Sequence, residues 1–99
     1  MRRRLVVRPK ARIDSVEAAL WYEEQRPGLG IQFTGELGRV LERIVESPAQ
    51  FPVVRRKTVR RALLQTFPYH VYFDLRGDQV IIMAVYHERR HPDTWKRRK

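Results

Sequence analysis

The sequence contains no cysteine, which excludes disulfide bonds and thiolate metal sites and is typical of proteins from a reducing compartment. It also contains no long apolar run. The longest, residues 80–86, has seven residues, whereas a helix that crosses a bilayer needs about 20. Near the N-terminus only residues 5–7 are consecutively apolar, too few for the core of a signal peptide. These absences predict a soluble, cytoplasmic protein.

Acidic residues are outnumbered: 11 Asp and Glu stand against 21 Lys and Arg, which gives a net charge of +10 and a pI near 11.0. Seven of the carboxylates lie in residues 13–53, so the basic charge is concentrated in residues 2–12, 55–61 and 89–99. Such a balance is expected of proteins that bind polyanions or acidic partners. A plain nucleic-acid-binding module, held by phosphate contacts, is therefore one candidate function.

The length of 99 residues is sufficient for a single domain with one modest core. Four segments favour β-strands, at residues 4–8, 59–67, 69–75 and 80–87. The last three form a meander, with Pro68 in its first turn and Arg-Gly-Asp at residues 76–78 in its second. Since the final strand is apolar on both pleat faces, we expect it inside the sheet, between the first and third strands.

A first helix is predicted from residue 15 to about residue 26. Asp14 has the side chain and position of an N-cap, followed three residues later by Glu17 as in a capping box. Val16, Ala19 and Leu20 are predicted to form the buried stripe.

A second helix follows the Pro-Gly-Leu-Gly turn at residues 27–30, and Pro48 ends it. Its apolar residues recur at i, i+4, i+7, i+8 and i+11, namely Phe33, Leu37, Val40, Leu41 and Ile44. A turn this short predicts an antiparallel helical hairpin.

The predicted fold is α+β, with element order β-α-α-β-β-β and a small, mainly antiparallel sheet of order 1-4-3-2. The helical hairpin is expected to cover one sheet face. The other face, lined by Leu64, Tyr72 and about half of residues 80–86, would then be open. An exposed apolar surface of that size indicates a protein partner.

Basic and histidine side chains follow the meander: Arg60, Arg61, His70, His87, Arg89 and Arg90. RNA cleavage by its own 2′-hydroxyl needs a base, an acid and cations, and imidazoles and guanidinium groups suit these roles. Strand alternation places Arg60 and Arg61 on opposite faces, so at most one of them joins any given site. A solvated basic surface, or a surface for a partner, is the alternative interpretation.

Two further patterns have simpler explanations. Gly28-Leu29-Gly30 follows a helix instead of a strand and lacks the third glycine of a nucleotide-binding loop, so it is interpreted as a helix end and turn. His70, His87 and His91 have no ligand-like spacing. We therefore expect neither a metal nor a cofactor.

The ordered set of motifs along residues 12–95 resembles the toxins of the RelE/ParE superfamily from bacterial type II toxin–antitoxin systems. The motifs are Trp21-Tyr22, Gln25, Pro27-Gly28-Leu29-Gly30, Phe33, Pro48, Phe51-Pro52, residues 59–64, Phe67-Pro68-Tyr69, residues 71–73, Val85, His87, Arg90, Pro92 and Trp95. The resemblance implies a single toxin domain over residues 1–99, with a basic tail at 92–99. It implies no cofactor, no membrane, and a hetero-oligomer with a cognate antitoxin whose flexible acidic or amphipathic segment wraps the toxin.

Two branches of the superfamily imply different targets. RelE-like members cleave messenger RNA on the ribosome and are enzymes, whereas ParE-like members act on DNA gyrase without being enzymes. RelE-like toxins have basic residues on the first meander strand, an arginine on the second, and an arginine and a tyrosine near the C-terminus. Here Arg61 matches the first, His70 replaces the second, and no C-terminal tyrosine follows Arg90. The helical hairpin and the Phe67-Pro68-Tyr69 turn favour the ParE-like branch.

The resemblance assigns three sets of site residues. In a RelE-like enzyme the catalytic residues would be Arg61, His70, His87 and Arg90. The antitoxin would bind the open sheet face, at Leu64, Tyr72, Ile81, Met83 and Val85. The target would bind Arg60, Arg89 and Trp95.

Overall fold

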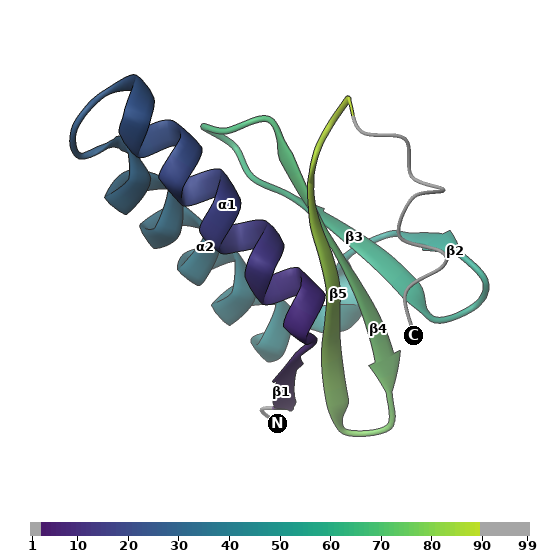
Figure 1. Ribbon diagram of the computed structural model, residues 1–99. Coiled ribbons are helices and arrows are strands. Elements are labelled where there is room, and N and C mark those ends of the chain that lie inside the picture. The colour runs from purple at the N-terminus through teal and green to yellow at the C-terminus, as the bar shows by residue number, and fades with distance from the viewer. Residues whose placement is uncertain (1–2, 90–99) are drawn as a thin grey trace.

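The computed structural model describes residues 3–89 and has two layers, a helical hairpin and a twisted sheet (Figure 1). The elements in chain order are β1 (Arg4–Val7), α1 (Pro9–Gln25), α2 (Leu29–Glu46), the 3₁₀ turn η1 (Pro48–Gln50), β2 (Val53–Arg55), β3 (Val59–Leu63), β4 (Tyr69–Arg76) and β5 (Gln79–His87).

The five strands form one sheet of order β1-β5-β4-β3-β2. β1 runs parallel to β5, and the other pairs are antiparallel. The predicted α+β class and the predicted order of four strands are confirmed. The sheet gains one strand, β2, from residues that the sequence analysis assigned to no helix or strand. β2 has three residues and pairs with β3 alone, so it forms a short outer edge.

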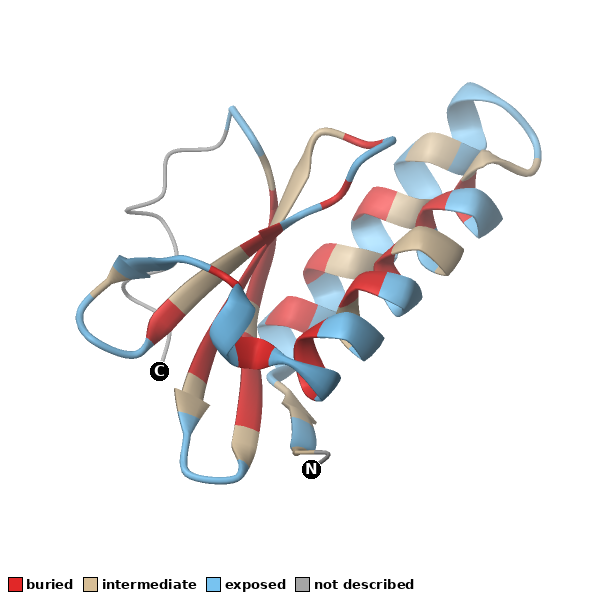
Figure 2. Cartoon of the chain, turned by 180° about the vertical axis from the view of Figure 1, so that it is seen from behind, coloured by how far each residue is buried: buried red, intermediate tan, exposed pale blue. Residues whose placement is uncertain are grey.

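Both helices lie on the same face of the sheet, as Figures 1 and 2 show from opposite sides. α2 packs as its periodicity predicts: Phe33, Leu37, Val40 and Ile44 are buried, and Leu41 is half-buried. They contact Val71, Phe73, Val80 and Ile82 of the central strands in one apolar core. The central position of β5 follows from its two apolar faces.

α1 begins at Pro9, six residues before the predicted start. Proline suits the first helical position, because its φ is already helical and its missing N–H has no partner there. Asp14 therefore lies inside the helix, and the N-cap prediction for it is wrong. Its side chain is buried, and its Oδ2 accepts a hydrogen bond from the Val85 N–H at 3.0 Å. The carboxylate thus joins α1 to the sheet.

The buried face of α1 also differs from the prediction. Ala11, Asp14 and Ala18 are buried against the sheet, whereas Val16 and Leu20 are 52% and 61% exposed and Ala19 is half-buried. Figure 2 shows the same division between the inner and outer sides of the helices. Apolar residues occur around the whole circumference of α1, so periodicity alone does not select a face. Small alanines let α1 approach β5 closely, and the larger side chains point outward.

Aromatic rings join the hairpin to the turn between β3 and β4. The rings of Tyr22 and Phe33 stack at 5.5 Å, and Phe67 meets them edge to face at 4.7 and 5.2 Å. Tyr69 lies 5.1 Å from the ring of Phe33. Burial raises the pKa of Tyr22 above its ordinary value. The cluster thus brings together four of the motif residues, Tyr22, Phe33, Phe67 and Tyr69.

Glu36 of α2 makes a second connection to the same turn. Its Oε2 accepts the backbone N–H of Gln65 and, at 2.9 Å, that of Thr66. Burial alone would raise the pKa of Glu36, but the hydrogen bonds from Thr66 and Gln65 and the charge of Arg39 outweigh it, so the pKa is lowered. The carboxylate is therefore stabilised in its charged form in the folded state.

We predict that Glu36→Gln lowers the free energy of unfolding by about 1–2 kcal/mol at pH 7. This is near the low end of the about 1.5–3 kcal/mol for a hydrogen bond to a charged group, because the carboxylate is partly exposed to solvent. Since the folded pKa is depressed, this contribution is present above the ordinary pKa of 4.5 and is lost as pH falls through the folded value. Urea denaturation at pH 7 and pH 3 measures the loss of stability and its dependence on pH. Glu24→Gln, at an exposed position of α1, is the control. If the free energy of unfolding differed between Glu36→Gln and wild type by the same amount at both pH values, the assignment would be contradicted.

Candidate functional site

The sheet face away from the helices is apolar at its centre and closed. Val59, Tyr72, Ala84 and Tyr86 form a separate buried cluster there, with Met83 half-buried beside it. Strand alternation explains the separation, because Val71 and Phe73 on either side of Tyr72 belong to the core under the helices. The predicted open apolar face is therefore wrong for the described residues.

The residues predicted to bind the antitoxin do not share one face. Leu64 and Val85 belong to the core under the helices, and Tyr72 to the cluster on the other side. All three and Ile81 are at most 7% exposed, and Met83 is half-buried. A β-bulge accounts for the position of Val85: Phe73 pairs with Ile82 but Tyr72 pairs with Ala84, so Met83 is an extra residue. One extra residue reverses the facing of every later side chain, Val85 included.

Arg61 and His70 lie on the same side of the sheet, the side away from the helices. Leu63 pairs with His70, and Arg61 pairs with Tyr72, so Arg61 and His70 are diagonal neighbours across β3 and β4. Burial lowers the pKa of His70, the charges of Arg61 and His87 lower it further, and Glu88 opposes them. The pKa of His70 therefore lies below the ordinary value of a histidine.

His87 lies on the opposite side from His70. It pairs with Tyr69, and the two rings meet edge to face at 5.4 Å on the side of the helices. Its Nδ1 accepts the N–H of Arg89 at 3.1 Å. The predicted catalytic residues are thus divided between two faces: Arg61 and His70 on one, His87 on the other. Arg90 lies outside the described residues.

The predicted target-binding residues also have different environments. Arg60 is half-buried, and its Nη1 donates to the carbonyl oxygens of Phe51 at 2.6 Å and Ala49 at 3.3 Å. It therefore holds the segment before β2 in place. Arg89 is exposed, and Trp95 lies outside the described residues.

Large exposed apolar side chains gather on the hairpin, where the sequence predicted a buried stripe. Ile13, Val16 and Leu20 of α1 are 54%, 52% and 61% exposed, and Ile31 of α2 is 78% exposed. We call these four residues the hairpin surface. The three on α1 recur at i, i+3 and i+7, so they form one stripe along the helix. A contiguous apolar surface of this kind is typical of a protein-binding site.

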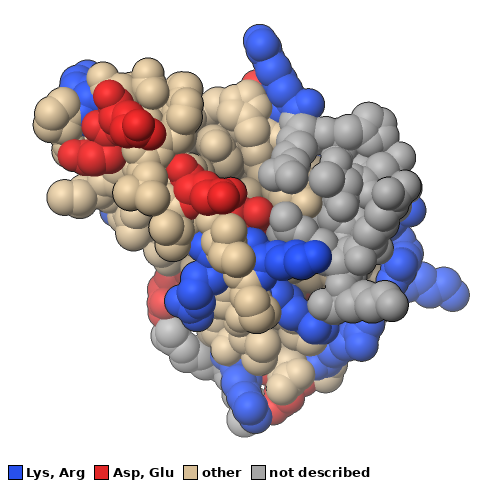
Figure 3. Space-filling view, viewed as in Figure 1, with Lys and Arg blue, Asp and Glu red and all other residues tan. Residues whose placement is uncertain are grey.

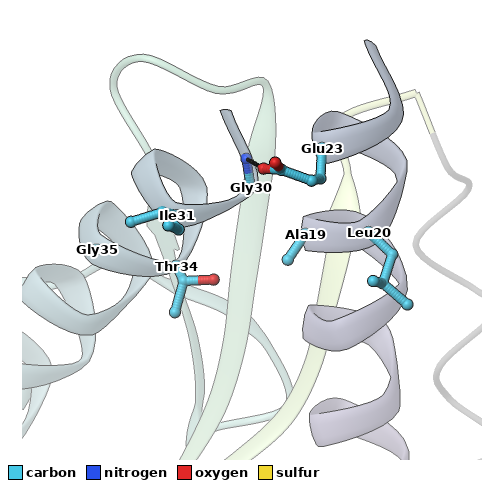
Figure 4. Close-up of a pocket in the computed structure, with 7 residues that line it drawn as sticks. All are labelled: Ala19, Leu20, Glu23, Gly30, Ile31, Thr34 and Gly35. Atoms are coloured by element: carbon cyan, nitrogen blue, oxygen red, sulfur yellow. Dashed lines mark hydrogen bonds between the residues drawn. The ribbon is translucent and has the colours of Figure 1, made fainter. Parts of the chain in front are cut away.

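A shallow groove of about 480 Å³ runs between the two helices at this surface (Figure 4). It is lined by Ala19, Leu20, Glu23, Gly30, Ile31, Thr34 and Gly35. The helices approach closely because Gly30 has no side chain: a Cβ there would lie 2.6 Å from the Ala19 carbonyl oxygen. Sequence reasoning assigned Gly30 to the turn. The signal that it missed is the pairing of the small residues Ala19 and Gly30.

Glu23 closes the groove at the end near the turn. Its Oε1 accepts the N–H of Gly30 at 3.0 Å, and its two carboxylate oxygens accept the N–H of Gly28 at 3.0 and 3.1 Å. The exposed carboxylates of Glu17 and Glu24 lie on the same helix. Figure 3 shows several acidic side chains gathered over the hairpin at the upper left, with most of the basic ones elsewhere on that view and a few other acidic ones near its lower edge. The hairpin thus differs from the rest of the protein in both charge and hydrophobicity.

Within residues 3–89, no group of three or more His, Asp or Glu side chains is arranged to hold a metal ion. In the same part of the chain, no helix is both long enough and apolar enough to cross a membrane.

Comparison with known proteins identifies a structural relative. No family model and no curated protein matches the sequence. Among solved structures, a chain of the "Chromosomal ParDE TA system from P. aeruginosa" superposes with a TM-score of 0.76 and is 16% identical. The alignment covers 86% of this chain and 95% of that one. The protein therefore has the same fold, over nearly the whole length of both chains, as a component of a ParDE system.

Proposed function

We propose that this protein is the toxin of a type II toxin–antitoxin pair, a single domain over residues 1–99 that a cognate antitoxin neutralises in the cytoplasm. The observation that supports this best is the exposed hairpin surface, on a fold shared with a ParDE chain. The motif resemblance of the sequence points to the same class independently of the superposition.

The hairpin surface suits an amphipathic segment of the antitoxin. Leu20 and Ile31 border one groove, and small residues form its floor. A helix with apolar side chains at i, i+3, i+4 and i+7 would fill such a groove and bury both residues. The acidic residues of the same antitoxin would face the basic parts of the toxin. The antitoxin site is therefore proposed on the hairpin, in place of the sheet face.

For the target we propose DNA gyrase, as in the ParE-like branch. This choice depends on the resemblance of the hairpin and the Phe67-Pro68-Tyr69 turn. It is also supported by the division of His70 and His87 between two sheet faces, because these two imidazoles cannot then act on one phosphate. On this proposal the protein inhibits by binding and is not an enzyme.

We expect the purified protein to block supercoiling by gyrase, or to trap gyrase on cleaved DNA, and we expect the antitoxin to reverse the effect. A supercoiling assay with increasing toxin measures this, with the toxin–antitoxin complex as the control. If a saturating concentration of the toxin left supercoiling unchanged and trapped no cleaved DNA, gyrase would be excluded as the target.

The alternative target is ribosome-bound messenger RNA, and the adjacency of Arg61 and His70 favours it. A translation extract distinguishes the two: transcripts cleaved by wild type and intact with His70→Ala indicate a ribonuclease. Salt-sensitive nucleic-acid binding without growth arrest would instead support the basic binding module.

A further inference from the structure

Three grooves follow one another around α2. The first is the groove of the hairpin surface, where Ile31 and Gly35 lie on α2 and face α1 (Figure 4). The same two residues line a second groove, of about 380 Å³, between α2 and the turn that joins β3 to β4. A third groove, of about 250 Å³, shares three residues with the second, namely Glu36, Arg39 and Thr66. Because neighbouring grooves share residues, the three form one continuous path.

Gly35 is the place where a bound segment can cross α2 from the first groove to the second. A Cβ at this position would meet the Arg39 Nη1 at 3.5 Å, so the glycine leaves the helix surface low here. Ile31, one turn earlier, is 78% exposed and would be covered by a segment that crosses at Gly35. From Gly30 to Arg43 the helix rises about 20 Å, at about 1.5 Å per residue, so a partner helix of about 13 residues spans the path.

The two ends of the path differ in charge. The first groove is lined by one carboxylate, that of Glu23, and by no cation. The third groove is lined by two guanidinium groups, those of Arg39 and Arg43, and by one carboxylate, that of Glu36. The Glu36 carboxylate already accepts two backbone N–H groups of the turn between β3 and β4. The lining side chains therefore give one end a negative charge and the other end a positive charge.

The two arginines of the third groove are arranged to bind a carboxylate. Arg39 and Arg43 are exposed and lie at i and i+4, so they are neighbours on the surface of α2. The guanidinium carbon of Arg43 lies 5.8 Å from the centroid of the Phe51 ring, and this contact favours one orientation of the group. Glu42 and Glu46, the later carboxylates of α2, do not line the groove.

We propose that the amphipathic helix that fills the groove of the hairpin surface continues across α2 at Gly35 and places a carboxylate against Arg39 and Arg43. Guanidinium groups suit this role, because their paired N–H donors match the two oxygens of a carboxylate. The opposite end of the helix would carry a lysine or arginine near Glu23. The inference rests on the antitoxin site proposed above, and it adds the course of the bound segment and the order of its charges.

The charges also set the direction of the bound helix. A helix is stabilised by acidic residues in its first turn and by basic residues in its last turn. If its first turn lies at Arg43 and its last turn at Glu23, the helix runs antiparallel to α2. The antitoxin segment is therefore expected to begin with Asp or Glu and to end with Lys or Arg.

A synthetic peptide tests this course. The probe is a capped peptide of about 14 residues, long enough to span the path. It has glutamates in its first turn, lysines in its last turn, and leucines at i, i+3, i+4 and i+7 between them. Nuclear magnetic resonance follows the backbone amides of Gly30 in the first groove, Gly35 at the crossing and Gln65 in the third groove. We expect all three resonances to shift with the same half-saturation.

Two pairs of variants separate the path from the general properties of the surface. Gly35→Leu fills the crossing and should weaken binding about tenfold or more. Gly38→Leu makes the same change three residues later, at an exposed position outside the three grooves, and should leave binding unchanged. Arg43→Gln should weaken binding about two- to fivefold, the range for an exposed ion pair. Arg4→Gln removes the same charge from β1 and should have no such effect.

The proposal would be overturned if the three resonances did not saturate together, or if either pair of variants changed the affinity equally. Leu20→Glu distinguishes this outcome from a failure of the hairpin site. If Leu20→Glu weakened peptide binding but Gly35→Leu and Arg43→Gln did not, the antitoxin site on the hairpin would stand and only the course across α2 would be wrong. If Leu20→Glu also had no effect, both would be wrong.

Discussion

Leu20→Glu is expected to reduce the affinity of the protein for its antitoxin at least about 100-fold. Leu20 borders the groove between the helices and is 61% exposed in the free protein. In the proposed complex an apolar segment covers it, so the new carboxylate would be buried without a partner. Loss of a central apolar contact costs about 2 kcal/mol or more, and burial of an unpaired charge adds to this.

The fold should be unaffected, because substitutions at exposed positions usually change the free energy of unfolding by at most about 0.5 kcal/mol. Leu63→Glu is the matched control: it makes the same change at a leucine that is 49% exposed on β3, outside the groove. Titration calorimetry with the antitoxin measures the affinity, and circular dichroism the fold. If Leu20→Glu still bound the antitoxin tightly, or if Leu20→Glu and Leu63→Glu lost the same amount of affinity, the antitoxin would bind elsewhere.

Gly30→Ala is expected to lower the free energy of unfolding by about 2–3 kcal/mol, within the range for overpacking of a tight site. The added Cβ would lie 2.6 Å from the Ala19 carbonyl oxygen and 3.0 Å from Glu23 Oε1. The first contact is with backbone, so the helices must move apart. The second disturbs the carboxylate that accepts the N–H groups of Gly28 and Gly30.

Gly38→Ala provides the comparison within the same helix. Nothing lies within 4 Å of a Cβ at Gly38, and the residue is exposed. Alanine there should stabilise the protein by about 0.5–1 kcal/mol, because it lowers the entropy of the unfolded chain and favours the helix. Guanidinium denaturation measures the free energy of unfolding of both variants, which should change in opposite directions. A neutral Gly30→Ala would show that the helices are less closely packed than the structure indicates.

The sheet was predictable because its signals are local. β5 is apolar on both faces, which placed it inside the sheet, and Pro68 and Gly77 mark the two meander turns. α2 was equally predictable, because only one of its faces is apolar. β2 was not, because three residues with Arg55 at their end have no periodicity of their own; pairing with β3 creates the strand.

The candidate site was much less predictable. The bulge at Met83 reverses the facing of Val85, and strict alternation has no means of detecting it. For α1, the sequence offered apolar residues on several faces, and the face that packs is the one with Ala11 and Ala18. The exposed hairpin surface is the consequence of that choice.

By itself, the sequence determined the class of the fold, the order of four of the strands, the packing of α2 and the unequal distribution of charge. These properties depend on periodicity and composition, which are written along the chain. Only the tertiary structure decided which face of α1 is exposed, which strand residues change sides after Met83, and that two grooves meet across α2 at Ile31 and Gly35. Each of these depends on the close packing of one element against another, and side-chain volume and backbone register settle such contacts only when the elements meet.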